Sequence, residues 1–246
     1  MIAAHQTMLA PQEAPLPYGS VAFSGNMDSN LSWEQSGVAN PTTFSFTAWV
    51  KAAASPTNGA FVKVGLRQVG STPGNGLGVG FGSTRFDPGY TGRHIVGLAE
   101  SVAWAASTTN AQTINAWHHY AIVLATNALS VYQDGSLFWS NTFSNIRSGT
   151  PNVVYIGGNR GGNSGGDTNR FLACNMTRCA MWGRALSASE VAADYADGKN
   201  APTTTSGLDH YWPMSSADNY LSDEAGAATL TAGAGGVTIS QDSPFA

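Results

Sequence analysis

Residues 130–139, SVYQDGSLFW, place an Asp-Gly pair between two short runs of alternating apolar and polar residues. A tight two-residue turn of type I′ needs a positive φ at both central positions, and Asp-Gly is among the few pairs that adopt it readily. We therefore predict a β-hairpin with Asp134 and Gly135 at its tip. That register makes two cross-strand pairs, Tyr132 with Leu137 and Val131 with Phe138.

The same alternation runs through most of the chain. Residues 44–50, FSFTAWV, put three bulky apolar side chains on one face, while Trp49 falls on the other, where it predicts a second, partly covered surface. About a dozen strands are expected in all, including those at residues 20–25, 60–70, 76–82, 94–100, 117–124, 153–158, 171–182 and 230–239.

One short helix is predicted over residues 188–197. Ser187 is placed to cap it, and Glu190 follows three residues later, which is the spacing of a capping box. Gly198 provides the stop.

Four glycines alternate with apolar residues in residues 76–82, GLGVGFG. In a strand they all fall on one face and leave the backbone bare. We favour packing of a neighbouring side chain, an aromatic one, over this stripe; the alternative is close approach of a ligand or partner.

Composition excludes several classes of protein. Of the 246 residues 42% are hydrophobic and only 11% charged, and the net charge is −4. Because no cluster of Lys and Arg could follow a phosphate backbone or an anionic membrane, neither nucleic acid nor membrane is expected as a partner. The fold expected is an all-β, two-sheet antiparallel sandwich. Its predicted parts are an extended arm at 1–19, the sandwich at 20–198, and a linker with C-terminal strands packed on that sandwich at 199–246.

Two features bear on the compartment. Cys174 and Cys179 point to opposite faces of one predicted strand, so we expect free, buried thiols, as in a reducing environment. The N-terminal stretch has no basic segment, and prolines interrupt it, so it does not resemble a secretory signal.

Four motifs follow one another along the chain: Phe46-Thr47-Ala48-Trp49-Val50, Trp117-His118-His119, Tyr132-Gln133-Asp134-Gly135 and Arg184-Ala185-Leu186-Ser187-Ala188-Ser189-Glu190. In this order they resemble the laminin-G-like, concanavalin-A-like jelly-roll family over roughly residues 20–196. The resemblance implies a sandwich that binds glycans or proteins more often than it does chemistry.

The chain departs from the family pattern in two places. Met176-Thr177-Arg178 stands where the family carries an Ile-Asp-Glu step, which weakens any inherited calcium or ligand site. The family's opening Tyr-Trp-Pro phrase appears late, as Tyr211-Trp212-Pro213, with the acidic turn at 223–226. We therefore expect the C-terminal segment to supply a strand that usually comes first.

No catalytic residues are expected. A retaining glycosidase needs two carboxylates about 5 Å apart, and no strand here carries such a pair. His118 and His119 are adjacent on a strand, so they face opposite ways and cannot chelate one metal.

Ligand-binding candidates lie in glycine-rich and aromatic loops. They are Tyr90, Trp104, Asn159, Asp167, Asn169 and Arg170. No cofactor is expected. Calcium would need at least six oxygens, and the acidic candidates are Asp28 and Asp167, each among asparagines that serve equally as turn formers.

The leading hypothesis from the sequence is a non-enzymatic virion structural protein of a tailed phage, either a capsid decoration or a fibre-type protein. It would be made in the host cytoplasm and then exposed on the virion, where it binds capsid or tail proteins, copies of itself and host glycans. Its arm would contact partners through Met1, Ile2, Met8, Leu9, Leu16 and Tyr18.

The alternative is a carbohydrate-binding, lectin-like module, secreted or carried to the cell surface by a non-classical route. A glycoside hydrolase or polysaccharide lyase is the least favoured function, because function must be argued from a site rather than from a fold.

Overall fold

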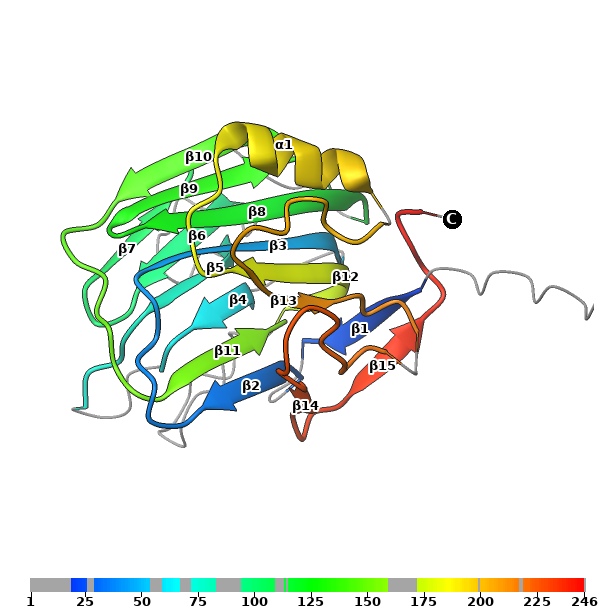
Figure 1. Cartoon of the computed structure of the whole chain (residues 1–246), viewed down its shortest axis with the longest axis horizontal. Helices are drawn as coiled ribbons and strands as arrows, with labels where there is room; N and C mark the ends of the chain where they lie inside the picture. Colours follow the sequence, from blue (N-terminus) through cyan, green and yellow to red (C-terminus); the bar gives the residue numbers. More distant parts are fainter. Residues whose placement is uncertain are drawn as a thin grey trace, which may run out of the picture.

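The computed structural model describes residues 19–25, 29–53, 59–66, 72–82, 94–108, 113, 115–158, 172–198, 200–216 and 219–245. In these residues the chain forms two antiparallel sheets and one short helix (Figure 1). This is the all-β sandwich that the sequence predicts.

The first sheet has eight strands among the described residues, in the order β10-β9-β8-β3-β12-β1-β15, with β13 also paired to β12. Their bounds are β1 Ser20–Ser24, β3 Thr43–Ala52, β8 Trp117–Ala125, β9 Ala128–Gln133, β10 Ser136–Thr142, β12 Ala173–Trp182, β13 Leu208–Trp212 and β15 Val237–Ser240.

The second sheet has seven strands in the same part of the chain, in the order β14-β2-β11-β4-β5-β6-β7. Their bounds are β2 Leu31–Gln35, β4 Gly59–Val64, β5 Leu77–Gly82, β6 His94–Ala99, β7 Ala103–Ala106, β11 Asn152–Ile156 and β14 Thr231–Ala232.

Aromatic rings from both sheets meet in the core between them. The ring of Phe61 in β4 lies 4.6 Å from that of Phe81 and 5.0 Å from that of Tyr120 in β8, measured between centroids. All three are almost fully buried. Burial also raises the pKa of the Tyr120 hydroxyl, so it stays neutral.

Both cysteines are free and buried, as the sequence predicts. Burial raises the pKa of the Cys174 and Cys179 thiols, so both remain protonated at neutral pH. They act as small apolar residues of β12.

Helix α1 (Ala188–Asp197) covers part of the outer face of the first sheet, beside β8, β9 and β10 (Figure 1). Its N-terminus has the predicted capping box between Ser187 and Glu190. On its inner side, the Tyr195 ring stacks on Trp49 with centroids 5.6 Å apart. The second, partly covered surface predicted from Trp49 is therefore the face of the sheet on which the helix packs.

A buried polar network fixes the helix to the sheet. One carboxylate oxygen of Asp194 accepts a hydrogen bond from the Arg178 guanidinium at 3.0 Å, and the other lies 3.0 Å from His119 Nε2. Burial raises the pKa of Asp194, but the His119 hydrogen bond and the Arg178 charge outweigh it and hold that pKa below its ordinary value. Arg178 thus occupies a position that is acidic in the family pattern, and here it stabilises the fold by bonding to Asp194.

The predicted hairpin forms, with a correction to its register. Leu137 lies opposite Tyr132, as expected. Val131, however, lies opposite Trp139, so its predicted pairing with Phe138 is wrong. The register shifts between Leu137 and Trp139, because a bulge places an extra residue in β10.

The glycine stripe is explained by packing, as favoured, although the nearest described neighbours of these glycines are backbone atoms and the aliphatic side chains of Lys63 and Val96, with no aromatic side chain among them. A Cβ at Gly80 would overlap the carbonyl oxygen of Gly59 in the paired strand, and one at Gly82 would overlap the side chain of Val96. At Gly78 a Cβ would stand 3.2 Å from Cδ of Lys63. The last contact matters because the buried Lys63 side chain needs this space.

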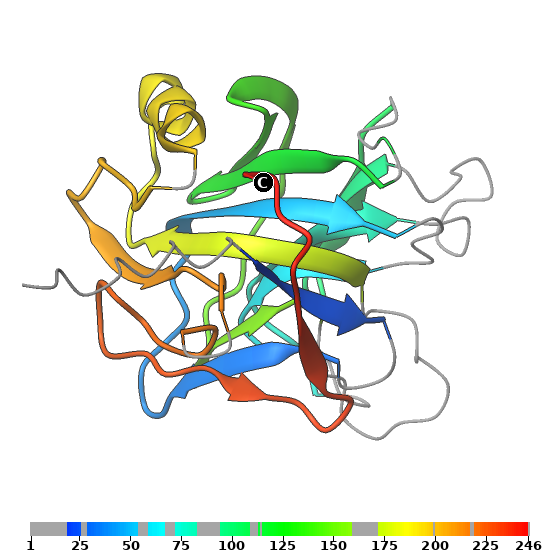
Figure 2. The same ribbon diagram turned by 90° about the vertical axis from the view of Figure 1, so that its right-hand side faces the viewer.

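The C-terminal segment contributes to both sheets. In the first sheet β13 pairs with β12, and β15 pairs with β1 (Figure 2). In the second sheet β14 pairs with β2. The single strand predicted over residues 230–239 is wrong: a turn at Gly233–Gly236 separates β14 from β15. Gly236 has φ +69, which ends the run of extended backbone.

Asp223 organises the loop that follows β13. Its carboxylate accepts hydrogen bonds from backbone N–H groups and lies 2.7 Å from His210 Nδ1. The N–H donors belong to Tyr211, Ala225, Gly226 and Ala228. Burial raises the pKa of Asp223, but these backbone bonds and the His210 contact outweigh it and hold that pKa below its ordinary value.

We predict that Asp223→Asn lowers the free energy of unfolding by about 2 kcal/mol at pH 7, because charge-assisted bonds to the carboxylate are lost. A lowered folded-state pKa stabilises the fold above the ordinary carboxyl pKa of about 4, and this contribution disappears as the pH falls through the folded value. Urea unfolding of wild type and variant should therefore differ at pH 7 and converge in acid.

Asp209→Asn is the matched control, since Asp209 is exposed and its carboxylate has no hydrogen bond or ion pair to the described residues. A difference between Asp223→Asn and wild type that stayed constant from pH 7 into acid would contradict the assignment.

Candidate functional site

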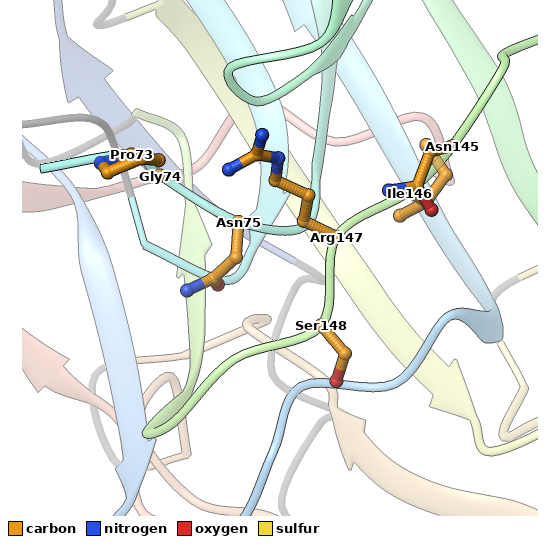
Figure 3. Close-up of a pocket in the computed structure, with 7 residues that line it drawn as sticks. All are labelled: Pro73, Gly74, Asn75, Asn145, Ile146, Arg147 and Ser148. Carbon is orange, nitrogen blue, oxygen red and sulfur yellow. The ribbon is translucent and has the colours of Figure 1, made fainter.

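A shallow hollow lies at the end of the sandwich where β10 ends and β5 and β11 begin (Figure 3). Its volume is about 460 Å³. We call it the loop depression. Seven residues line it, Pro73, Gly74 and Asn75 before β5, and Asn145, Ile146, Arg147 and Ser148 between β10 and β11.

The Asn75 side of the loop depression is held by hydrogen bonds to two neighbouring elements. Asn75 Oδ1 accepts from the backbone N–H of Leu66 at 2.9 Å, and its own N–H donates to the Leu66 carbonyl at 2.9 Å. The N–H of Gly74 donates to Ser101 Oγ, in the turn between β6 and β7, at 2.8 Å.

Below this segment lies a buried charge. The Lys63 ammonium group is fully buried and donates to the Asn75 carbonyl oxygen at 2.6 Å. A carboxylate oxygen of Glu100 lies 3.8 Å from the Lys63 Nζ. An ammonium group in the interior is stable only when it is paired and hydrogen-bonded, so Lys63 fixes the Asn75 carbonyl from beneath.

Asn40 holds the other side of the loop depression. Its Oδ1 accepts from the N–H of Gly149 at 2.8 Å, and its carbonyl oxygen accepts from Ser148 Oγ at 2.8 Å. The two sides are joined directly, because the N–H of Gly76 donates to the Arg147 carbonyl at 2.7 Å. The loop depression therefore has a backbone fixed by contacts from several elements.

The exposed side chains at the rim are those of Asn145, Arg147 and Ser148, while Ile146 is buried. In Figure 3 the Arg147 guanidinium extends from its loop toward the segment 73–75. The lining thus offers amide, hydroxyl and guanidinium groups for hydrogen bonds. Its described residues include no carboxylate, histidine or cysteine that could act as a general acid or base.

A second hollow, of about 330 Å³, lies near the C-terminal segment. It is bordered by Arg178, Asn200 and Tyr211 among others, and burial is the main cause that raises the pKa of Tyr211 to about 12. Nη1 of Arg178 is buried without a hydrogen-bond partner in the described structure. Because the rest of this guanidinium belongs to the network that holds α1, we assign the second hollow a structural role.

One of the candidates from the sequence lies within the described residues. Trp104, in β7, is 43% exposed, on the strand that follows the turn supporting Gly74. The other ligand, arm and calcium candidates lie outside the described residues: Tyr90, Asn159, Asp167, Asn169, Arg170, Asp28, Met1, Ile2, Met8, Leu9, Leu16 and Tyr18.

Sequence reasoning missed Asn75, Asn145, Arg147 and Ser148. The sequence marks their segments as polar turns rich in Asn, Gly and Ser, but such turns are common in this chain.

Among the described residues, no group of three or more His, Cys, Asp and Glu side chains could hold a metal ion. No helix in this part of the chain is both long and apolar enough to span a membrane.

We predict that Lys63→Met loosens the loop depression and lowers the free energy of unfolding by about 3 kcal/mol, because Glu100 loses its buried cation. Hydrogen exchange should accelerate at the amides of Asn75 and Gly76. The amide of Phe143 serves as the reference, because it donates to the Asn127 carbonyl at 2.9 Å and not to a group that Lys63 contacts. Unchanged exchange at Asn75, or equal acceleration at all three amides, would contradict the local role of Lys63.

Comparison with known proteins places the fold. A family model described as the concanavalin A-like lectin/glucanases superfamily matches residues 24–192, which is more than half of the chain. No curated protein matches the chain in sequence.

Several solved structures are similar in fold. A proposed carbohydrate-binding protein from Bacteroides ovatus ATCC 8483 has a TM-score of 0.67 and 15% identity, over 94% of this chain and 62% of that protein. The heptameric SAP-like pentraxin of Limulus polyphemus has a TM-score of 0.60 and 13% identity, over 92% and 96% of the two chains. A Trypanosoma rangeli sialidase has a TM-score of 0.46 and 20% identity, over 63% of this chain and 23% of that one.

This chain therefore spans less than two thirds of the Bacteroides protein. The TM-scores of 0.67 and 0.60 establish likeness of fold to the first two proteins, and identities of 15% and 13% leave function to be argued from the site. The match to the family over residues 24–192 agrees with the motifs and with the observed sandwich. The chain belongs to the concanavalin A-like lectin/glucanases superfamily.

Proposed function

We propose that the protein is a non-enzymatic carbohydrate-binding protein whose ligand occupies the loop depression. The observation that carries this proposal is the combination of an exposed polar rim with a fixed backbone. Sugar hydroxyls both donate and accept hydrogen bonds, and amide and hydroxyl side chains can match both roles. A site that is already ordered loses less conformational entropy on binding.

The family and the neighbours support this proposal over the alternatives. The family name includes lectins, and the Bacteroides ovatus protein is itself proposed to bind carbohydrate. Non-enzymatic function is part of the proposal, since the part of the lining that the structure describes has no pair of carboxylates for glycoside hydrolysis.

The virion role expected from the sequence gains no support from these comparisons. It depends on the arm at residues 1–19 and on capsid or tail partners, and most of that arm lies outside the described residues. Carbohydrate binding therefore replaces it as the leading function.

The test is a glycan array on the full chain, with calcium and with a chelator, followed by calorimetric titration of the best ligand. Asn145→Ala should weaken binding about tenfold, the effect of losing roughly one well-made hydrogen bond. Asn145 is exposed and lines the loop depression, so its removal should leave the fold intact.

Asn200→Ala is the matched control, because it removes an amide that borders the second hollow. Its affinity should equal that of the wild type. Failure to bind any glycan under either condition, or loss of affinity with Asn200→Ala but not with Asn145→Ala, would overturn the proposal.

A further inference from the structure

Arg147 differs from the other cations of the described structure. Lys51 pairs with Asp242 at 2.7 Å, and Arg184 pairs with Glu190 at 2.6 Å. The buried Arg178 and Lys63 have carboxylate oxygens at 3.0 and 3.8 Å. Of the five Lys and Arg residues in the described ranges, Arg147 is the one that has no carboxylate of a described residue within ion-pair distance.

This unpaired charge stands on a protein with an excess of acids. The chain has 15 Asp and Glu against 11 Lys and Arg, for a net charge of −4. Among the described residues no carboxylate lines the loop depression, and one of its seven described lining residues, Arg147, has a charged side chain. The hollow therefore has a local positive charge, opposite in sign to the protein as a whole.

The backbone at Arg147 is fixed, while its guanidinium has no hydrogen bond or ion pair to the described residues. Its carbonyl oxygen accepts from the Gly76 N–H at 2.7 Å, and the neighbouring N–H of Ile146 donates to Asn127 Oδ1 at 2.8 Å. The side chain is exposed, and its guanidinium extends toward the segment 73–75 (Figure 3). A guanidinium presents parallel N–H donors that match the two oxygens of a carboxylate.

We infer that the loop depression selects acidic saccharides, with Arg147 binding a sugar carboxylate while the amide and hydroxyl groups of the rim bind the hydroxyls. This inference rests on the proposed function and names the ligand class of the same site. The anionic group supplies the carboxylate that Arg147 lacks among the described residues.

The test compares an oligosaccharide of uronic acids with the same oligosaccharide after its carboxyl groups have been reduced to alcohols. Wild-type protein should bind the acidic form at least about tenfold more tightly, as expected for a charge-assisted bidentate pair. Raising the salt concentration should weaken binding of the acidic form and leave the reduced form unaffected.

Arg147→Gln should bring the affinities for the two forms close together, and Arg147→Lys should retain part of the preference. Lys51→Gln removes the same charge from the outer face of the first sheet, where Lys51 pairs with Asp242, and should keep the full preference. This control separates a local carboxylate contact from a change in net charge.

The outcomes separate this inference from the proposed function. If the wild type binds both forms equally and Asn145→Ala weakens both, the carbohydrate site stands and the acidic selectivity is wrong. If Lys51→Gln abolishes the preference as fully as Arg147→Gln does, selectivity reflects net charge and the role of Arg147 is wrong. If neither form nor any other glycan binds, both proposals fail.

Discussion

The central constraint on this structure is that loops crossing the end of a sandwich carry backbone groups that must find partners once they are buried. Side chains distant in sequence supply these partners. Asn40 bonds to Ser148 and Gly149, more than 100 residues away, and Lys63 bonds to the Asn75 carbonyl. The polar contacts that satisfy the loops also fix the hollow between them, so the candidate site is a consequence of closing the fold.

Charge is distributed differently over the two parts of the molecule where polar groups gather. On the outer face of the first sheet, Asp194 lies between Arg178 and His119, and the charges there hold the helix in place. At the loop depression the buried charge, Lys63, donates to the Asn75 carbonyl, and the exposed one, Arg147, lacks a carboxylate partner in the described structure. The first arrangement stabilises the fold, whereas the second leaves a charge available for a ligand.

Much of the fold could be predicted from local patterns, because hairpin turns, strand alternation and capping boxes depend on neighbouring residues. The pairing of Tyr132 with Leu137 follows from the Asp-Gly turn, but the bulge that places Trp139 opposite Val131 has no local signature. The site could not be predicted in the same way. Asn75 and Arg147 lie on loops about 70 residues apart, and only the tertiary fold brings them together.

The most direct measurement is a crystal structure of the full chain with a bound acidic oligosaccharide. The account predicts electron density for the sugar in the loop depression, with its carboxylate against the Arg147 guanidinium and a hydroxyl within hydrogen-bond distance of Asn145. A ligand bound elsewhere, whether beside Trp104 or in the second hollow at Asn200, with the loop depression empty, would contradict it.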